Sequence, residues 1–225
     1  MARPSLMAGT TRRLPLFPLN TVLFPNAALP LQIFEERYKL MLRDCLQGDS
    51  SFGVVLIRSG SEVGEPSEPY SVGTVARITQ VSDAGEGKIF VSAVGQQRFR
   101  IVEIVQTRPY MTAEVELLEE ATVAGQPDLP SPDTEVIRRG AARYVQLTLG
   151  LGGGWITKLK LPVDDTFLSY YLPKLLQVEM PHKQALLELP STALRLGAEQ
   201  AILEAQTPEL HARLTKELLS KFARN

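Results

Sequence analysis

Residues 14–38 read LPLFPLNTVLFPNAALPLQIFEERY, and this stretch decides how the chain begins to fold. Its first 21 positions carry no charge, which is long enough for a membrane-spanning helix. They also contain Pro15, Pro18, Pro25 and Pro30. A proline inside a helix removes a backbone hydrogen bond and clashes with the preceding turn. The stretch therefore predicts short extended pieces broken by turns, and no membrane helix.

The end of this stretch changes to a helical period. Apolar residues recur on one helical face at Phe34, Tyr38, Met41, Leu42, Cys45 and Leu46. Glu35 and Glu36 lie in the first turn of this pattern, where the helix dipole favours negative charge. We therefore expect a helix over 34–46. Cys45 lies on its apolar face and is expected to be a small core residue rather than a reactive thiol.

Strand patterns dominate the chain from residue 52 to residue 118. Apolar runs or alternating apolar and polar residues cover 52–57, 72–81, 88–94, 99–101 and 110–118. The segment DAGEG at 83–87 predicts a turn between two of them. About six strands with one helix indicate a closed or nearly closed β-barrel-like domain.

The second half of the chain follows a helical period. Residues 121–134, ATVAGQPDLPSPDT, are typical of a linker. Helices are expected over 136–149, 167–175, 181–189 and 192–205, and Thr207 with Pro208 predicts the start of a last one. The sequence thus predicts an α+β protein with a β-domain at 13–120, a linker at 121–134 and a helical bundle at 135–225.

Composition narrows the classes of function. The chain has 24 Lys and Arg against 25 Asp and Glu, so its formal net charge is −1. Because the basic and acidic residues are nearly equal in number, nucleic acid is an unlikely partner, since phosphate binding needs an excess of basic residues. Cys45 is the only cysteine, which excludes an intrachain disulfide and a cysteine-based zinc site and fits a cytoplasmic location.

No motif for catalysis, a cofactor or a metal is visible. The pattern GxxxxGK[ST] is absent, and the glycines at 150–154 lack the GxGxxG spacing. There is no GxSxG, and His182 and His211 have no partner at metal-ligand spacing. Asp164 and Asp165 are expected to cap a helix rather than to act as a catalytic pair. We therefore expect no enzyme activity and no cofactor.

Basic residues on one strand leave a binding function open. Arg98 and Arg100 alternate with Phe99 and Ile101 and are expected to face away from the core. Together with Arg77 they could bind an anion or RNA, although a solvated strand face is the favoured interpretation.

Several longer strings resemble one family. LPLFPLNTVLFPNAALPLQIFEERY at 14–38 is similar to the opening of the amino-terminal substrate-binding domain of Lon proteases. The strings FGVVLI (52–57), VGTVARI (72–78), VSAVGQQRFRI (91–101) and PYMTAEVELLEE (109–120) agree in the same order. HKQALLEL (182–189) and LRL (194–196) resemble helical elements that follow this domain. The resemblance covers about residues 13–205 and looks closest to small stand-alone proteins built on this domain.

This resemblance implies a PUA-like β-barrel domain followed by a helical bundle. It also implies recognition of polypeptide substrates or of a partner in proteolysis, by contact with apolar groups or by strand addition to a sheet edge. A full Lon enzyme adds ATPase and serine–lysine peptidase modules, which we expect this chain to lack. RNA binding and an unrecognised hydrolase remain as alternatives. The candidate binding residues are Phe24, Arg37, Arg98, Arg100 and Tyr110.

Overall fold

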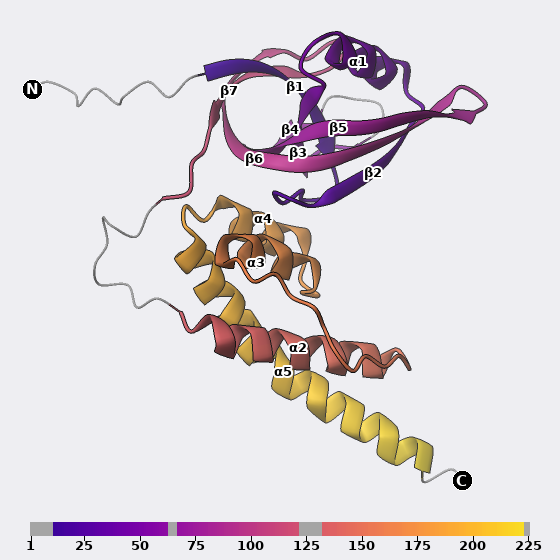
Figure 1. Cartoon of the computed structure of the whole chain (residues 1–225). Helices are drawn as coiled ribbons and strands as arrows, with labels where there is room; N and C mark the ends of the chain where they lie inside the picture. The colour runs from indigo at the N-terminus through magenta and orange to yellow at the C-terminus, as the bar shows by residue number, and fades with distance from the viewer. Residues whose placement is uncertain (1–10, 63–66, 122–131, 223–225) are drawn as a thin grey trace, which may run out of the picture. The chain divides into compact units, whose positions relative to one another are not determined.

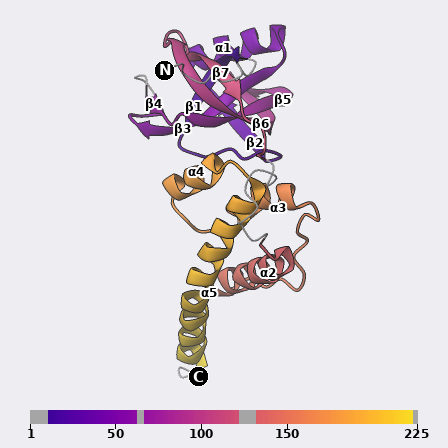
Figure 2. The ribbon, with the colours of Figure 1, turned by 90° about the vertical axis from the view of Figure 1, so that its left-hand side faces the viewer.

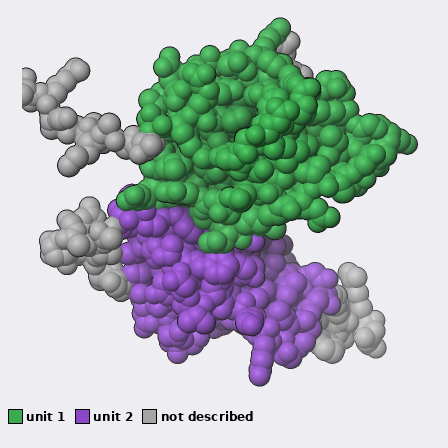
Figure 3. Space-filling view, turned by 45° about the horizontal axis from the view of Figure 1, so that its top comes forward, with its two compact units in different colours: residues 1–119, 180–188 green, residues 120–179, 189–225 purple. Residues whose placement is uncertain are grey.

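A computed structural model describes residues 11–62, 67–121 and 132–222 of the chain. Figures 1 and 2 show the ribbon from two sides. The chain divides into two compact units, which Figure 3 distinguishes by colour. Unit 1 contains Met1–Glu119 and Met180–Glu188, and unit 2 contains Glu120–Glu179 and Leu189–Asn225. Most of the expected linker, 122–131, lies outside the described residues.

Unit 1 is built on a closed barrel. Its five strands are β1 (Thr11–Leu19), β3 (Ser51–Ser59), β5 (Val72–Gly85), β6 (Lys88–Gln106) and β7 (Thr112–Leu117). They follow the order β1-β7-β6-β5-β3, and a parallel pairing of β1 with β3 closes the ring. The neighbouring pairs are otherwise antiparallel. The α+β fold with a β-barrel is therefore confirmed.

Two further strands attach to the barrel. β2 (Ala28–Ile33) pairs with β6, and the short β4 (Glu68–Pro69) pairs with β3. The barrel interior holds a buried apolar cluster centred on Leu16, Val55, Phe99 and Val115. Glycine lets the wall pack closely, because a Cβ added at Gly53 would lie 2.7 Å from both Leu16 and Phe99.

The opening stretch forms a longer strand than its prolines predict. β1 runs continuously through Pro15 and Pro18, whereas the sequence predicted two short pieces. The strand changes partner after Pro15, because residues 11–15 pair with β7 and residues 16–19 pair with β3. Each partner strand is therefore hydrogen-bonded to only part of β1, so neither pairing needs a backbone N–H donor at every position of the strand.

The turn that follows β1 is fixed against β6. The backbone N–H of Asn26 donates to Gly95 at 2.8 Å, and the N–H of Gly95 donates to Ala27 at 2.9 Å. Asn26 adopts a φ of 63°, a conformation that asparagine tolerates better than most residues. Phe24 is 3% exposed beside this turn.

Helix α1 (Glu36–Gln47) shows the expected apolar face. Tyr38, Met41, Leu42 and Cys45 are buried, and the ring of Tyr38 stacks on Phe17 at 4.0 Å between centroids. Phe34 and Leu46 were expected on the same face but are about half exposed. The helix begins two residues after Phe34, so Phe34 is not part of it, whereas Leu46 lies in its last turn.

Helix α4 (Met180–Glu188) belongs to unit 1, although the sequence placed it in the helical bundle. The side-chain amide of Gln184 donates to the carbonyl of Val72 in β5 at 2.9 Å. Arg98 in β6 donates to the carbonyl of Leu187 at 2.9 Å. A helical period predicts a helix but does not identify the element that the helix packs against, which explains the difference.

Unit 2 is helical. It contains α2 (Thr134–Leu151), α3 (Asp165–Tyr171), the 3₁₀ turn η2 (Leu172–Lys174) and α5 (Thr192–Phe222). Asp133 caps α2 and Asp164 caps α3, the latter through a 2.7 Å bond from the N–H of Phe167. The expected break at Thr207 is wrong, because α5 continues through Pro208 as one helix (Figure 2). Thr207 donates to the carbonyl of Leu203 instead of capping a new helix.

A buried arginine organises the centre of unit 2. Arg195 of α5 is fully buried, pairs with Glu120 at 3.0 Å and donates to the hydroxyl of Ser169 at 3.0 Å. Its guanidinium also lies 3.9 Å from the ring centroid of Tyr170. A buried charge is stable only when it is paired and hydrogen-bonded, so this network holds the first residue of unit 2 to α3 and α5.

Candidate binding surfaces

Two of the five sequence-derived binding candidates lie in the interior. Arg98 is 2% exposed, although the alternation of its strand predicted a solvent-facing side chain. It is buried because it bonds to Leu187 of α4, which is 89 residues away in sequence. Phe24 is buried in the turn beside β6. Neither side chain is available to a ligand on the surface, and the expected group of Arg77, Arg98 and Arg100 does not form one exposed face.

Arg37 and Tyr110 are partly buried and already engaged. Arg37 pairs with Glu35 at 3.0 Å and lies 4.5 Å from the ring centroid of Tyr38. The hydroxyl of Tyr110 donates to Asp44 at 2.8 Å. Burial raises the pKa of Tyr110 to about 12, and the bond to Asp44 adds to this shift. Arg100 alone of the five is well exposed.

An apolar strand segment in unit 1 was not singled out from the sequence. Val102, Ile104 and Val105 of β6 are each at least 39% exposed. This segment pairs with β7 on one side, and no strand among the described residues pairs with its other side beyond Ile101. An unpaired apolar edge is a template for an added strand. We call Val102–Gln106 the β6 edge.

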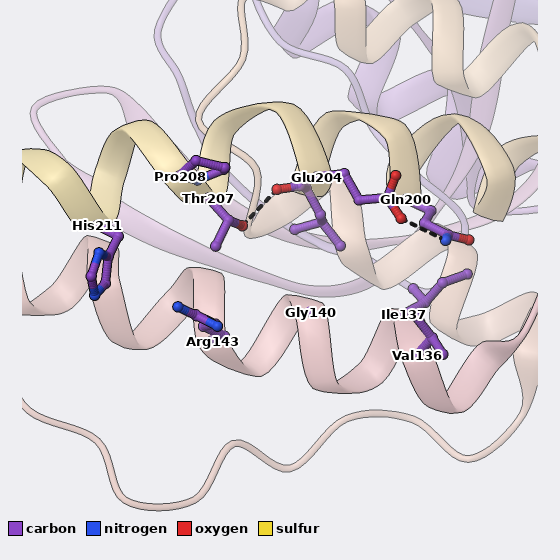
Figure 4. Close-up of a pocket in the computed structure, with 10 residues that line it drawn as sticks. Val136, Ile137, Gly140, Arg143, Gln200, Glu204, Thr207, Pro208 and His211 are labelled. Atoms are coloured by element: carbon purple, nitrogen blue, oxygen red, sulfur yellow. Dashed lines mark hydrogen bonds between the residues drawn. The ribbon is translucent and has the colours of Figure 1, made fainter.

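An apolar hollow lies in unit 2, between α2 and α5 (Figure 4). We call it the α2–α5 groove, and its volume is about 480 Å³. Pockets that hold small ligands typically have volumes of about 300–1,000 Å³. The lining residues are Val136, Ile137, Gly140 and Arg143 from α2, with Gln200, Leu203, Glu204, Thr207, Pro208 and His211 from α5.

The groove opens over Gly140, which has no side chain to fill it. Gly140 contributes only backbone, and a Cβ added there would meet Leu203 at an ordinary 3.8 Å. Ile137 and Leu203 are buried beneath the opening, while Val136 is 38% exposed at its side. The groove therefore presents apolar surface that a ligand could cover without moving the helices.

Polar groups stand around this apolar surface. Gln200 donates to the carboxylate of Glu204 at 2.8 Å, one turn along α5. Figure 4 shows Arg143 from α2 and His211 from α5 both projecting into the space between the helices. Arg143 forms no ion pair or side-chain hydrogen bond with the rest of the described chain. Its guanidinium is thus free to donate hydrogen bonds to a carbonyl or carboxylate group of a ligand.

The sequence did not reveal this groove. Gly140 looked like a weakness in a helix, His211 looked isolated, and Thr207 with Pro208 looked like a helix start. These residues share one site only because α5 is continuous and packs along α2. The glycine inside α2 was the one local signal.

The described part of the chain contains neither a metal-ligand cluster nor a membrane-spanning helix. No group of three or more His, Cys, Asp or Glu side chains is arranged to hold a metal ion there. None of its helices combines the length and the apolar character that crossing a membrane requires.

Comparison with known proteins places the chain in a family. The family model for the ATP-dependent protease La (LON) substrate-binding domain matches residues 13–205. Lon protease 2 of Myxococcus xanthus is 28% identical over 200 residues, which cover 87% of this chain and 24% of that protein. Lon protease of Koribacter versatilis is 38% identical over 116 residues, which cover 51% of this chain and 14% of that protein.

Solved structures agree with this assignment. A Lon N-terminal domain protein from Xanthomonas campestris has a TM-score of 0.62 and 27% identity, covering 84% of this chain and 98% of that one. The N-terminal domain of a Mycobacterium avium complex Lon protease shares the fold, with a TM-score of 0.55 and 17% identity over 86% of this chain and 98% of that one. The chain spans at most about a quarter of the length of the first curated relatives it matches. With a family match over most of its length, this chain belongs to the family of the Lon substrate-binding domain.

Proposed function

We propose that this chain binds segments of polypeptide that expose apolar side chains, and that it does not cleave them. The observation that carries the proposal is the match of residues 13–205 to the substrate-binding part of an ATP-dependent protease. The reported comparisons give no support to RNA binding. The free thiol of Cys45 suits a reducing compartment such as the cytoplasm.

The α2–α5 groove is the proposed binding site. Its floor of Ile137 and Leu203 is apolar, and its opening over Gly140 leaves room for a side chain of the ligand. Arg143, Gln200 and Glu204 stand beside this floor, where they can bond to the backbone of an extended peptide. Such a site recognises apolar side chains in general rather than a particular sequence.

The size of the groove sets the expected strength of binding. Burying one side chain the size of Val or Leu stabilises a complex by about 1.5–3 kcal/mol. A groove of about 480 Å³ holds only a few such groups, and association itself has a large entropic cost. Binding is therefore expected to be weak for one segment and stronger for a chain that offers several segments.

The β6 edge is a second surface for the same function. Strand addition uses backbone hydrogen bonds, which are independent of the ligand's sequence, and apolar side chains such as Val102 and Ile104 add contact area. Both surfaces favour unfolded over folded ligands, because folded proteins bury the groups that they recognise.

The direct test compares two forms of one protein as ligand. A small disulfide-bonded protein is labelled with a fluorophore and used either folded or reduced and carboxymethylated. Anisotropy titration with the full chain should show saturable binding of the unfolded form only. Equal binding of both forms, or of neither, contradicts the proposal. Analysis of the unfolded ligand by gel after incubation should show no cleavage.

A further inference from the structure

A second, polar pocket lies on the barrel of unit 1. It has a volume of about 200 Å³ and is lined by Arg12, Asp49, Ser51, Val75, Arg77, Gln96, Gln97 and Leu117. These residues come from β1, β3, β5, β6 and β7 and from the turn before β3. The barrel thus brings two guanidinium groups and two side-chain amides to one small hollow, which differs in chemistry from the apolar α2–α5 groove.

A β-bulge places both glutamines at this pocket. Thr74 pairs with Arg98 and Ala76 pairs with Gly95, so Gln96 and Gln97 together oppose the single residue Val75. In a regular strand, consecutive side chains point to opposite faces of the sheet. Here the extra residue lets two consecutive glutamines line the same pocket, and bulges commonly re-aim side chains in this way.

The charges in the pocket are not balanced. Arg12 pairs with Asp49 at 2.9 Å and its guanidinium also lies 3.4 Å from the hydroxyl of Ser51. Arg77 has no ion pair or side-chain hydrogen bond among the described residues. Two arginines and one aspartate leave the pocket with one positive charge in excess.

The donors in the pocket are also incompletely used. The Nε–H group of Arg12 is buried and has no acceptor within the described chain. Gln97 donates to the carbonyl of Leu118 at 3.2 Å, while Gln96 lies at the 3.5 Å limit from two backbone carbonyls. A buried donor without an acceptor is costly, so an anion that approached Arg12, Arg77 and Gln96 would gain several charge-assisted hydrogen bonds.

We propose that this pocket binds a single carboxylate group, with Arg77 as its main partner and Gln96 and Gln97 as neutral donors. One negative charge neutralises the excess, whereas a phosphate dianion would reverse it. A volume of about 200 Å³ is enough for a carboxylate and one adjoining residue. The carboxylate could be the end of a polypeptide chain or the side chain of Asp or Glu. The inference goes beyond the proposed function and does not depend on the α2–α5 groove.

The test uses the full chain labelled with ¹⁵N and three short peptides. Acetyl-trialanine with a free carboxylate represents a chain end, and its carboxamide has no carboxylate. Acetyl-Ala-Glu-Ala-carboxamide carries only a side-chain carboxylate. Titration should shift the side-chain amide signals of Gln96 and Gln97 with one or both carboxylate peptides, and the pair identifies the source. The carboxamide of trialanine should produce no shift.

Two arginine variants make the result specific. Arg77→Gln should weaken carboxylate binding about tenfold or more, because it removes a charge-assisted bond. Arg58→Gln is the matched control, since Arg58 is also an exposed arginine on a strand of the barrel and does not line the pocket. Its binding should equal that of the wild type. Asp49→Asn provides an independent variant and should tighten binding, because it removes the competing negative charge.

Several results would overturn the proposal. These are binding of neither carboxylate peptide, equal shifts with the carboxamide, or an affinity that Arg77→Gln and Asp49→Asn both leave unchanged. A failure here would leave the binding of unfolded polypeptide at the α2–α5 groove unaffected, because the two sites share no residue.

Discussion

At the scale of single residues, two buried titratable groups show how the interior controls chemistry. Cys45 is 4% exposed on the core face of α1. Glu199 of α5 is fully buried, and neither of its carboxyl oxygens has a hydrogen-bond partner among the described residues. Burial disfavours the charged form of both groups and so raises the pKa of both. The core role of Cys45 was visible in its helical spacing, whereas nothing in the sequence distinguished Glu199 from the exposed acids of the same helix.

Cys45 should react slowly in the folded protein. Burial raises the pKa of its thiol to about 12, and the nearby charges of Asp49 and Asp44 add to the shift. Only the thiolate reacts with a disulfide reagent, so the native rate should be lower than the unfolded rate by about two orders of magnitude or more. The measurement is the release of thionitrobenzoate with and without urea. Since Cys45 is the only cysteine, similar rates in the two states would show that the thiol is accessible.

Glu199 should make stability fall as the pH rises. Burial raises the pKa of its carboxyl from 4.5 to about 9, and the charge of Arg195 only partly opposes this. Between these two values the folded state holds a proton that the unfolded state releases. The free energy of unfolding should therefore decrease with pH in this window, by about 1.4 kcal/mol per pH unit at most.

The Glu199→Gln variant isolates this effect. Glutamine keeps the shape of the protonated carboxyl but does not titrate, so urea unfolding between pH 5 and pH 9 should lose the slope that Glu199 contributes. Glu204→Gln, an exposed acid on the same helix, should keep it. A slope that persists in Glu199→Gln would contradict the assignment.

At the scale of elements, patterns predicted most helices and strands but not their partners. The spacing of Tyr38, Met41 and Cys45 predicted α1 because a helical face repeats locally. The same reasoning predicted α4, yet its hydrogen bonds to Val72 and Arg98 cross about 90–110 residues of sequence and have no local signal. The break expected at Thr207 failed because tertiary packing kept α5 continuous despite Pro208.

Gly95 should not tolerate a side chain. An alanine Cβ at this position would lie 2.4 Å from the carbonyl oxygen of Phe24, which is backbone and cannot rotate away. Gly95→Ala should therefore displace the turn at 24–27 and lower the free energy of unfolding by about 1–3 kcal/mol. Urea denaturation measures the loss, and a variant as stable as the wild type would show that the turn is not held against β6.

Gly140 should behave in the opposite way. It lies inside α2, and an alanine Cβ would meet Leu203 at an ordinary contact distance of 3.8 Å. Alanine costs less backbone entropy than glycine in a helix, so Gly140→Ala should raise the free energy of unfolding by about 0.5–1 kcal/mol. The same urea experiment applies. A destabilised variant would mean that the groove over Gly140 is not open.

At the scale of the whole molecule, the family was visible in the sequence but the binding surfaces were not. The ordered strings from residue 14 to residue 196 predicted the family that the comparisons then showed. The α2–α5 groove joins residues 136–143 to 200–211, and the carboxylate pocket draws on five strands. Surfaces assembled over such separations depend on packing, which local patterns do not encode. The chain also passes between its two units three times, so no single boundary describes its organisation.

Filling the α2–α5 groove with a side chain and measuring the binding of unfolded polypeptide tests directly whether this groove is the binding site. Gly140→Leu places a side chain over the apolar floor, while Gly197→Leu makes the same change on α5, where a Cβ meets nothing within 4 Å and lies outside the groove. With the carboxymethylated ligand, Gly140→Leu should weaken binding about tenfold or more, and Gly197→Leu should leave it unchanged. If the two variants, both folded, bind the unfolded ligand as tightly as the wild type, the α2–α5 groove is not the binding site.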